Sequence, residues 1–224
     1  MAWKIPNIWQ DGECIILGGG SSVPQQLGVP DELIHSVSTG VKKAEKFSPY
    51  FQPIKSKHII GINMAFRLGT WVDMMFFGDA SFFKKNKQEI LAWQNLRITC
   101  ATFDKVVGIK RVKRSKQKYG ITGIRDEVCW NANSGAAAIN VAVHLGVKRI
   151  ILLGFDMQSV ENQTHWHQYY APKDLKKMKD TYKKHLAGFP EIARYCKSKN
   201  IEVLNASPNS ALQVFTKVQL KDVI

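Results

Sequence analysis

The sequence predicts an α/β protein with a doubly wound, mostly parallel, Rossmann-like sheet. Short apolar runs of strand length recur along the chain, and most of them end near Gly, Asn or Asp. Segments with helical spacing, such as residues 81–93, alternate with these runs. The run at residues 150–153 is continuously apolar, as expected of a strand covered on both faces of a parallel sheet. The expected strands are residues 13–17, 58–63, 72–77, 96–101, 149–153 and 201–205.

The segment from Asn131 to His167 is the unit around which the rest of the chain is expected to be organised. A helix opens near Ser134, which is a natural N-cap residue, and its small residues allow close packing against a sheet. Its apolar residues are distributed around almost the whole circumference of the helix, so we expect the helix to be buried. The strand that follows ends at Asp156, and ligands of such sheets bind beyond the carboxyl ends of the strands.

Composition indicates one globular domain spanning residues 1–224, because 45% of the residues are hydrophobic and 22% are charged. No apolar run approaches the roughly 20 residues that span a membrane. The N-terminus has no signal-peptide pattern, and the four cysteines are widely spaced. We therefore expect a cytoplasmic protein (in the host cytoplasm, if it is phage-encoded) with reduced thiols.

The net charge of +14 favours a polyanionic partner such as nucleic acid, although a basic chain can also simply be well solvated. Between Lys105 and Lys118 there are seven cations and no acid. We interpret residues 105–120 as a basic insertion, either a ribbon or a flexible loop, that contacts phosphates or is merely solvated. The candidate polyanion-binding residues are Lys110, Arg111, Lys113 and Arg114.

Polar residues follow the first three strands. The first strand ends at a glycine-rich turn, Gly18, Gly19, Gly20, Ser21 and Ser22, of the kind whose amides approach phosphates closely, or which merely reverses the chain. The second ends at Asn63, which could bind a base or sugar or could terminate the strand through a side-chain turn. The third stops at Gly78-Asp79.

Three further segments complete the prediction. Residues 40–56 contain lysines and two prolines and are expected to form a surface connection. Residues 172–199 are helical by pattern, broken near Gly188, and contribute to a helical lid-like segment at about 157–190. Residues 205–210 are expected to cap a final short helix from Ala211.

The polar loop after Asp156 carries His165 and His167, which suit proton transfer at neutral pH. Two histidines and a distant aspartate are thin evidence for zinc, so we predict no metal site of the protein's own. A divalent cation held by Asp156 or Asp79 together with ligand phosphates is compatible with the sequence but not required. A Gly-x-Ser-x-Gly elbow is lacking, which disfavours acyl-transfer hydrolysis.

An ordered set of motifs spans about residues 13–212: GGGSS, GIN, NSGAAAINVAVHLGVKRIILLGFDM, THWH and ASPNSAL. Together they resemble the Rossmann-like superfamily of small bacterial sialyltransferases and 6-hydroxymethylpterin pyrophosphokinase-like proteins. They look closer still to uncharacterised phage-encoded relatives. The resemblance implies that a cytidine nucleotide-sugar would be surrounded by Gly18, Gly19, Gly20, Ser21, Ser22, Asn63, Ser134 and Gly135.

The resemblance also implies roles for Asp156, in a recurring G-x-D element, and for Asn209 and Ser210, in a Pro-Asn-Ser turn. The sialyltransferase base is a histidine placed further along the chain. His165 and His167 align more naturally with the pyrophosphokinase-like branch, and His185 is a rival. The basic segment matches nothing in the family.

We therefore expect an enzyme, a nucleotide-dependent transferase that uses a nucleotide-activated sugar. Asp79 joins the nucleotide-binding set, and His165, His167 and Asp156 form the catalytic set. The acceptor would be phage DNA or another polyanion. One alternative is a Mg²⁺-dependent pyrophosphoryl transferase, which would require Asp156. Another is a non-catalytic nucleic-acid-binding or phage assembly protein. The oligomeric state does not follow from the sequence.

Overall fold

The computed structural model describes residues 2–159, 163–167 and 175–224, and for residues 175–178 it describes the backbone alone. The main sheet is built from β1 (Glu13–Leu17), β2 (His58–Ile62), β3 (Met74–Phe77), β4 (Leu96–Thr99), β5 (Ile109–Arg111), β8 (Arg149–Leu153), β9 (Glu202–Asn205) and β10 (Thr216–Lys217). Their order is β10-β9-β8-β1-β2-β3-β4-β5, and every ladder in it is parallel. The predicted doubly wound parallel sheet is confirmed.

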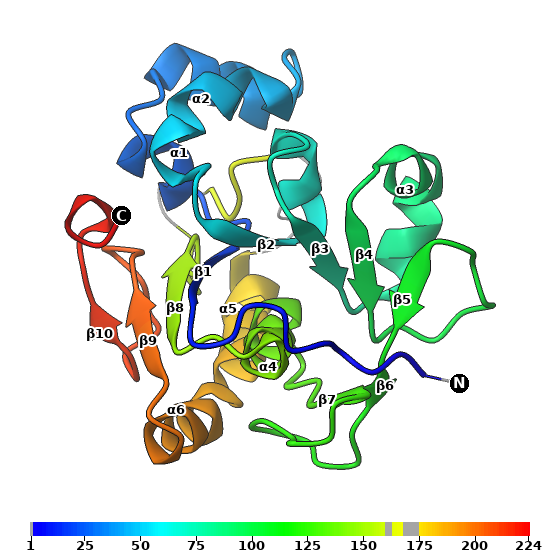
Figure 1. The fold of residues 1–224 in the computed structure, drawn as a ribbon. Coiled ribbons are helices and arrows are strands. Elements are labelled where there is room, and N and C mark those ends of the chain that lie inside the picture. The colour runs from blue at the N-terminus through cyan, green and yellow to red at the C-terminus, as the bar shows by residue number, and fades with distance from the viewer. Residues whose placement is uncertain (1, 160–162, 168–174) are drawn as a thin grey trace.

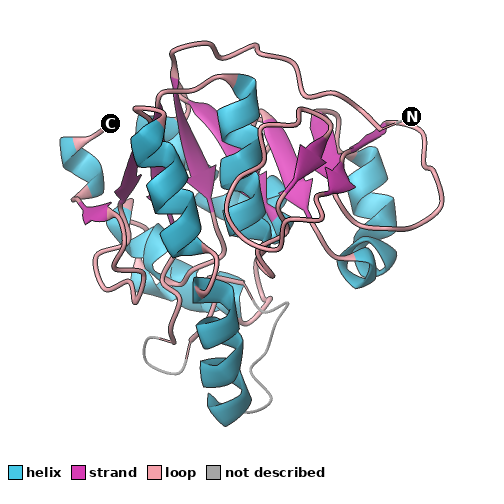
Figure 2. Cartoon of the chain, turned by 90° about the horizontal axis from the view of Figure 1, so that it is seen from below, coloured by secondary structure: helices cyan, strands magenta, loops and turns pink. Residues whose placement is uncertain are grey.

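Helices cover both faces of this sheet (Figures 1 and 2). One face is covered by α2 (Asp31–Ser38), η1 (Ala44–Ile54), η2 (Asn63–Leu68) and α3 (Ala80–Ala92), and α1 (Ser22–Gln26) follows β1. The other face is covered by α4 (Ser134–Leu145) and α6 (Phe189–Ser198), and α5 (Leu175–Leu186) precedes α6. The remaining elements are β6 (Lys113–Arg114), β7 (Glu127–Val128) and η4 (Leu220–Asp222). Of the helices described, none has the length and apolar character needed to cross a bilayer.

Alternation along the strands divides the core into two layers. Ile16 of β1 packs with the helices of one face, whereas Ile15 and Leu17 pack with those of the other. This is the consequence of successive strand side chains pointing to opposite faces. Both sides of each central strand are therefore apolar, which explains the continuous run in β8.

Helix α4 is buried along almost its whole length, as predicted. Its N-cap is Asn133 rather than the expected Ser134, because the Asn133 Oδ1 accepts hydrogen bonds from the amides of Gly135 and Ala136. Ser134 is the first helical residue. The helix ends at Gly146 in the left-handed conformation (φ 96°), a common helix terminator.

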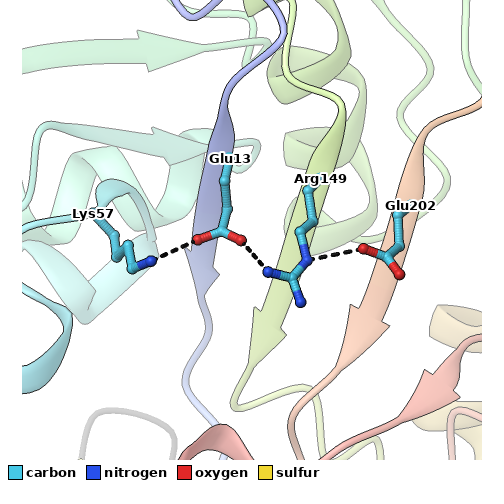
Figure 3. Close-up of polar contacts among 4 residues, drawn as sticks. All are labelled: Glu13, Lys57, Arg149 and Glu202. Atoms are coloured by element: carbon cyan, nitrogen blue, oxygen red, sulfur yellow. Dashed lines mark hydrogen bonds and ion pairs between the residues drawn. The ribbon is translucent and has the colours of Figure 1, made fainter. Parts of the chain in front are cut away.

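A row of ion pairs links the amino ends of four neighbouring strands (Figure 3). The Glu13 carboxylate of β1 accepts from Lys57 at 3.0 Å and from Arg149 of β8 at 2.6 Å. Arg149 also reaches Glu202 of β9 at 2.8 Å. Since these side chains are partly exposed, the pairs contribute modestly to stability. They connect neighbouring strands at their amino ends, on the side of the sheet opposite the carboxyl ends.

Two predictions of local structure are wrong. Residues 40–56 are not a surface connection, because η1 buries Phe47, Phe51 and Ile54 against the sheet. Its two prolines lack the amide donor and clash with the preceding turn of an α-helix, which disfavours a continuous α-helix here. The helix expected from Ala211 is also wrong, since the chain there turns and enters β10.

The basic segment contains two short strands, and residues 105–108 and 115–120 around them are turns and irregular structure. Its β5 is the edge strand of the main sheet, parallel to β4, and its β6 pairs in parallel with β7. A ribbon requires antiparallel neighbours, so that prediction is wrong. The segment therefore belongs to the body of the fold.

Candidate functional site

A cavity of about 380 Å³ lies at the carboxyl ends of the strands. In the sheet, β1 lies between β2 and β8, so the chain order reverses at this point. Such a switch point is where open α/β sheets bind ligands. The cavity walls come from the turns after β1, β2, β3 and β8, from the start of α4, from the 163–167 loop and from α5.

The structure brings most of the predicted site residues to this one cavity. They are Gly18, Gly19, Gly20, Asn63, Asp79, Ser134, Gly135, Asp156 and His165. They come from segments far apart in the sequence, and the parallel sheet gathers them because all its strands end at the same edge. Their roles in binding and catalysis remain predictions.

The glycine-rich turn packs tightly against the end of β8. A Cβ on Gly18 would lie 2.6 Å from the Gly154 oxygen, and one on Gly20 would lie 2.6 Å from both that oxygen and Asp156 Oδ2. The amides of Gly18 and Gly20 donate to Leu153 and Gly154 oxygens. These glycines are thus needed for close packing, and these two amides are already occupied within the protein.

The Asp156 carboxylate joins the end of β8 to the start of α1. One oxygen accepts from the Ser22 hydroxyl at 2.5 Å, and the other accepts from the Ser22 amide at 3.0 Å and the Ser21 hydroxyl at 3.4 Å. Burial raises the pKa of Asp156, and the hydrogen bonds from Ser22 and Ser21 oppose that rise. The arrangement indicates a positioning role, in which Ser21 and Ser22 hold Asp156 and do not themselves line the cavity.

The turn that leads into α4 has an unusual backbone conformation. Asn131 and Ala132 both have positive φ (54° and 53°), a conformation that costs free energy for residues other than glycine. The Asn131 side chain bonds the amide and carbonyl of Gly120 at 2.7 and 3.0 Å. These bonds hold the strained turn that presents Asn133 and Ser134 to the cavity.

Trp166 anchors the loop that carries the two predicted histidines. Its indole is buried (1% exposed), its Nε1 donates to the Gly18 oxygen at 3.2 Å, and its amide donates to the Gly19 oxygen. The loop is therefore tied to the glycine-rich turn. The rings of His165 and His167 lie 5.0 Å apart, centroid to centroid.

Both imidazoles are neutral near pH 7. Burial lowers the pKa of His165 to about 4, and the nearby His185 acts in the same direction. Burial, together with His165 and Arg67, lowers the pKa of His167 well below its usual value. The Nδ1 of His165 lies 2.8 Å from the Thr164 hydroxyl, which orients the ring. A neutral imidazole can accept a proton, as a general base must.

Two polar atoms in this wall have no partner among the described residues. They are the Oδ1 of Asn63 and the hydroxyl of Tyr182 on α5, both buried. Burial raises the pKa of Tyr182 to about 12, with Asp156 adding to the rise, so the hydroxyl keeps its proton. Sequence reasoning missed Tyr182, because its spacing in a lysine-rich helix suggested only an apolar position.

Asp79, His185 and Trp130 also line the cavity. Burial lowers the pKa of His185, and Asp79 partly counteracts this. Trp130 is held by Arg114, whose guanidinium lies 4.2 Å from the ring centroid and donates to Gly78 and Cys100 oxygens at 2.5 and 3.2 Å. His185, predicted only as a rival base, therefore shares the cavity with His165.

Besides Ser21 and Ser22, three of the predicted nucleotide-binding and catalytic residues lie outside this cavity. Asn209 is exposed, and Ser210 is buried with its hydroxyl donating to the Phe155 oxygen at 2.5 Å. The Ser210 hydroxyl also accepts from the Leu212 amide at 3.0 Å, so it serves the backbone of the turn. His167 faces a second cavity.

Of the four predicted polyanion-binding residues, three are engaged within the protein. Arg114 supports Trp130, and Arg111 donates to the Asp104 oxygen at 3.2 Å while stacking on Phe103. Lys113 pairs with Asp126 at 3.0 Å on the surface. Lys110 is exposed. Within residues 2–159, 163–167 and 175–224, no cluster of three or more His, Cys, Asp or Glu side chains could hold a metal ion.

Comparison with known proteins gives similarity of fold at low sequence identity. No protein-family model and no curated protein matches the chain. The chain is similar to the sialyltransferase CstII from Campylobacter jejuni in complex with the substrate analogue CMP-3FNeuAc (TM-score 0.47, 13% identity, 92% of this chain and 85% of that chain). It is also similar to CstII in complex with cytidine-5'-monophosphate (TM-score 0.48, 13% identity, 97% and 86%).

Proposed function

We propose that this protein is a nucleotide-dependent transferase that uses a nucleotide-activated sugar as its donor. The cavity at the switch point of the sheet has the volume of a small-ligand site. The sequence motifs that resemble sialyltransferases supply most of its wall, and they favour a cytidine nucleotide. The pyrophosphoryl-transfer alternative is tested alongside.

The observation that carries the proposal is a pair of polar atoms in this wall, Asn63 Oδ1 and the Tyr182 hydroxyl, which have no partner within the described part of the chain. A buried polar group without a hydrogen-bond partner lowers the stability of the protein. A ligand that supplies the missing partner removes this penalty, which favours binding. Asn63 Oδ1 would accept from a base amino group or a ribose hydroxyl. The Tyr182 hydroxyl would donate to a phosphate oxygen.

Three amides of the glycine-rich turn would not be available to a phosphate. The amides of Gly18, Gly20 and Ser22 already donate to acceptors within the protein. The Tyr182 hydroxyl and Ser134, at the first turn of α4, would stabilise the phosphate instead. This differs from a glycine-rich phosphate cradle, in which the turn amides themselves face the ligand.

In the proposed reaction, an acceptor hydroxyl oxygen bonds to the donor's sugar carbon. The bond between that carbon and the phosphate oxygen breaks, and its electron pair leaves on the nucleotide. The hydroxyl proton passes to a neutral imidazole, that of His165 or His167, with His185 as the rival. Since the chain carries a net charge of +14, we extend the proposal to an anionic acceptor, phage DNA included.

Calorimetric titration with cytidine, uridine, adenosine and guanosine monophosphates tests the donor site. We expect one of them to bind, and Tyr182→Phe to weaken it by about tenfold through loss of one hydrogen bond to a charged group. Tyr195→Phe is the matched control, because Tyr195 lies on α6 outside the cavity lining. Absence of binding by all four nucleotides at millimolar concentration would refute the proposal.

Chelation separates the two reaction types. If sugar-nucleotide turnover or nucleotide binding survives EDTA, the pyrophosphoryl alternative fails, because that chemistry needs Mg²⁺. If both are lost in EDTA and restored by Mg²⁺, and only ATP binds, the sugar-transfer proposal fails instead.

A further inference from the structure

A second, larger cavity of about 970 Å³ lies on the η2 and α3 side of the 163–167 loop. Its wall includes Trp166 and His167 from that loop, whereas His165 lines the first cavity. Further lining residues come from η2, from the end of α3 and from the start of η1. The two cavities are thus adjacent at this loop, and each has one imidazole of the pair in its wall. A Cβ added to Gly19, which lines the first cavity, would lie 2.8 Å from His165 Cδ2 and 3.4 Å from His167 Nε2, so both rings lie beside the glycine-rich turn.

Two nitrogen donors in this second wall lack an acceptor within the described protein. They are Nε of Arg67 on η2 and Nε1 of Trp93 at the end of α3, and both are buried. A guanidinium and an indole have no acceptor atoms, so only an oxygen or another acceptor can satisfy them. Arg67 is held in place by Glu89, which its Nη2 contacts at 2.5 Å.

The charges around the cavity favour an anion. The basic residues of its wall are the exposed Lys42 and Lys43 and the partly buried Arg67, and the acidic residues there are Glu45 and Glu89. Glu89 is already paired with Arg67. The lining is therefore positive on balance, and its unsatisfied groups are all donors.

We propose that the second cavity binds the acceptor substrate through an anionic group, a carboxylate or a phosphate, on a small molecule. Oxygens of that group accept from Arg67 and Trp93, and the lysines select for negative charge. The acceptor hydroxyl then lies toward the imidazole pair, whose ring centroids are 5.0 Å apart, so that its proton passes to His167. The assignment as acceptor rests on the proposed function, whereas the anion site itself does not.

The indole N–H resonance of Trp93, assigned by its loss in Trp93→Phe, provides a direct readout in ¹⁵N-edited NMR spectra. Titration of the nucleotide-free protein with glucose 6-phosphate or inorganic phosphate at millimolar concentration should shift this resonance. Glucose alone should shift it much less. The Trp130 indole, in the wall of the first cavity, should not respond to these probes but should respond to the nucleotide that binds there.

Trp93→Phe and Arg67→Lys should each weaken glucose 6-phosphate binding by about tenfold, the effect of losing one hydrogen bond to a charged group. Trp71→Phe is the matched control. Its indole Nε1 already donates to the Ser48 hydroxyl at 3.1 Å and the Leu68 oxygen at 3.0 Å. That variant should lose stability and keep the affinity.

Three outcomes would overturn the inference: no shift of the Trp93 resonance with either phosphate probe, an equal shift with glucose, or unchanged affinity in Trp93→Phe and Arg67→Lys. Because the titration is done without nucleotide, its failure does not count against the donor site. Conversely, phosphate binding here without nucleotide binding in the first cavity would support the anion site and refute only the transferase.

Discussion

The imidazoles of His165 and His167 lie 5.0 Å apart, with His165 lining one cavity and His167 the other, and the buried Trp166 lies between them in the sequence. The Trp166 indole is buried and bonded to the Gly18 oxygen. It packs edge-on against Phe47 of η1, at 6.2 Å between ring centroids. The anchored tryptophan therefore sets the position of both histidines relative to the glycine-rich turn.

Gly20→Ala should destabilise the fold. Its Cβ would lie 2.6 Å from a backbone oxygen of Gly154 and from Asp156 Oδ2, so the turn after β1 would have to move. We expect a loss of about 1–3 kcal/mol in the free energy of unfolding, measured by urea denaturation. Gly123→Ala, where a Cβ meets nothing within 4 Å, should be neutral or slightly stabilising. Equal stability of the two variants would contradict this account of the turn.

Asp156→Asn should also destabilise the protein, because the carboxylate accepts from both the hydroxyl and the amide of Ser22. An asparagine side chain at this position would present its own N–H donor to either the hydroxyl or the backbone amide of Ser22, which are donors themselves. The expected loss is about 1–3 kcal/mol in the free energy of unfolding. Asp104→Asn, at an exposed position, is the control. A variant of unchanged stability but abolished activity would instead indicate that Asp156 acts directly on substrate.

Stability should fall as the pH is lowered below about 6.5. The pKa of His165 is 6.5 in the unfolded chain and about 4 in the folded protein, so only the unfolded chain binds the proton between these values. The full effect of this group is about 3 kcal/mol, gained as pH rises through that window. The lowered pKa values of His144, His167 and His185 act in the same direction, whereas the raised pKa of Asp156 opposes them.

The contribution of His165 can be isolated by urea denaturation at a series of pH values. His165→Asn should show a flatter dependence of unfolding free energy on pH than the wild type, since one titrating group is gone. His35→Asn, at an exposed position on α2, should keep the wild-type slope. Parallel slopes for all three proteins would show that His165 titrates as in the unfolded chain.

Among the basic residues on and around β5 and β6, we expect arginine to contribute to stability and the exposed lysines to contribute to any binding of DNA. Arg114→Met removes the support of Trp130 and two backbone contacts, so it should lower stability. Lys110→Ala with Lys116→Ala, both exposed, should leave stability unchanged. If DNA binds this edge, the double lysine variant should reduce the salt dependence of DNA affinity by about two ions. Unchanged salt dependence would locate any DNA contact elsewhere.

Much of this architecture could be predicted from local patterns. The apolar run of β8 and the alternation of strands with helices predicted the parallel sheet. A strand that is buried on both faces of a sheet is continuously apolar, and this pattern is visible in the sequence. The convergence of Gly19, Ser134 and His165 on one cavity follows from the same rule, since parallel strands end together. Predictions failed where residue type was ambiguous. The prolines of η1 indicated a surface loop although the segment is buried, and the charged residues of β5 indicated a solvated insertion although it is an edge strand.

The sequence by itself determined that a parallel sheet would gather glycines, carboxylates and imidazoles at one edge, because residue type and spacing control burial and strand direction. Only the tertiary structure decided which groups are free to act. It assigned Asp156 to the serines of α1, Arg114 to Trp130 and Ser210 to a backbone oxygen. It left Tyr182, Asn63, Arg67 and Trp93 with buried atoms that lack a partner among the residues the structure describes. Hydrogen-bond partners of this kind come from segments distant in sequence, so no local pattern encodes them.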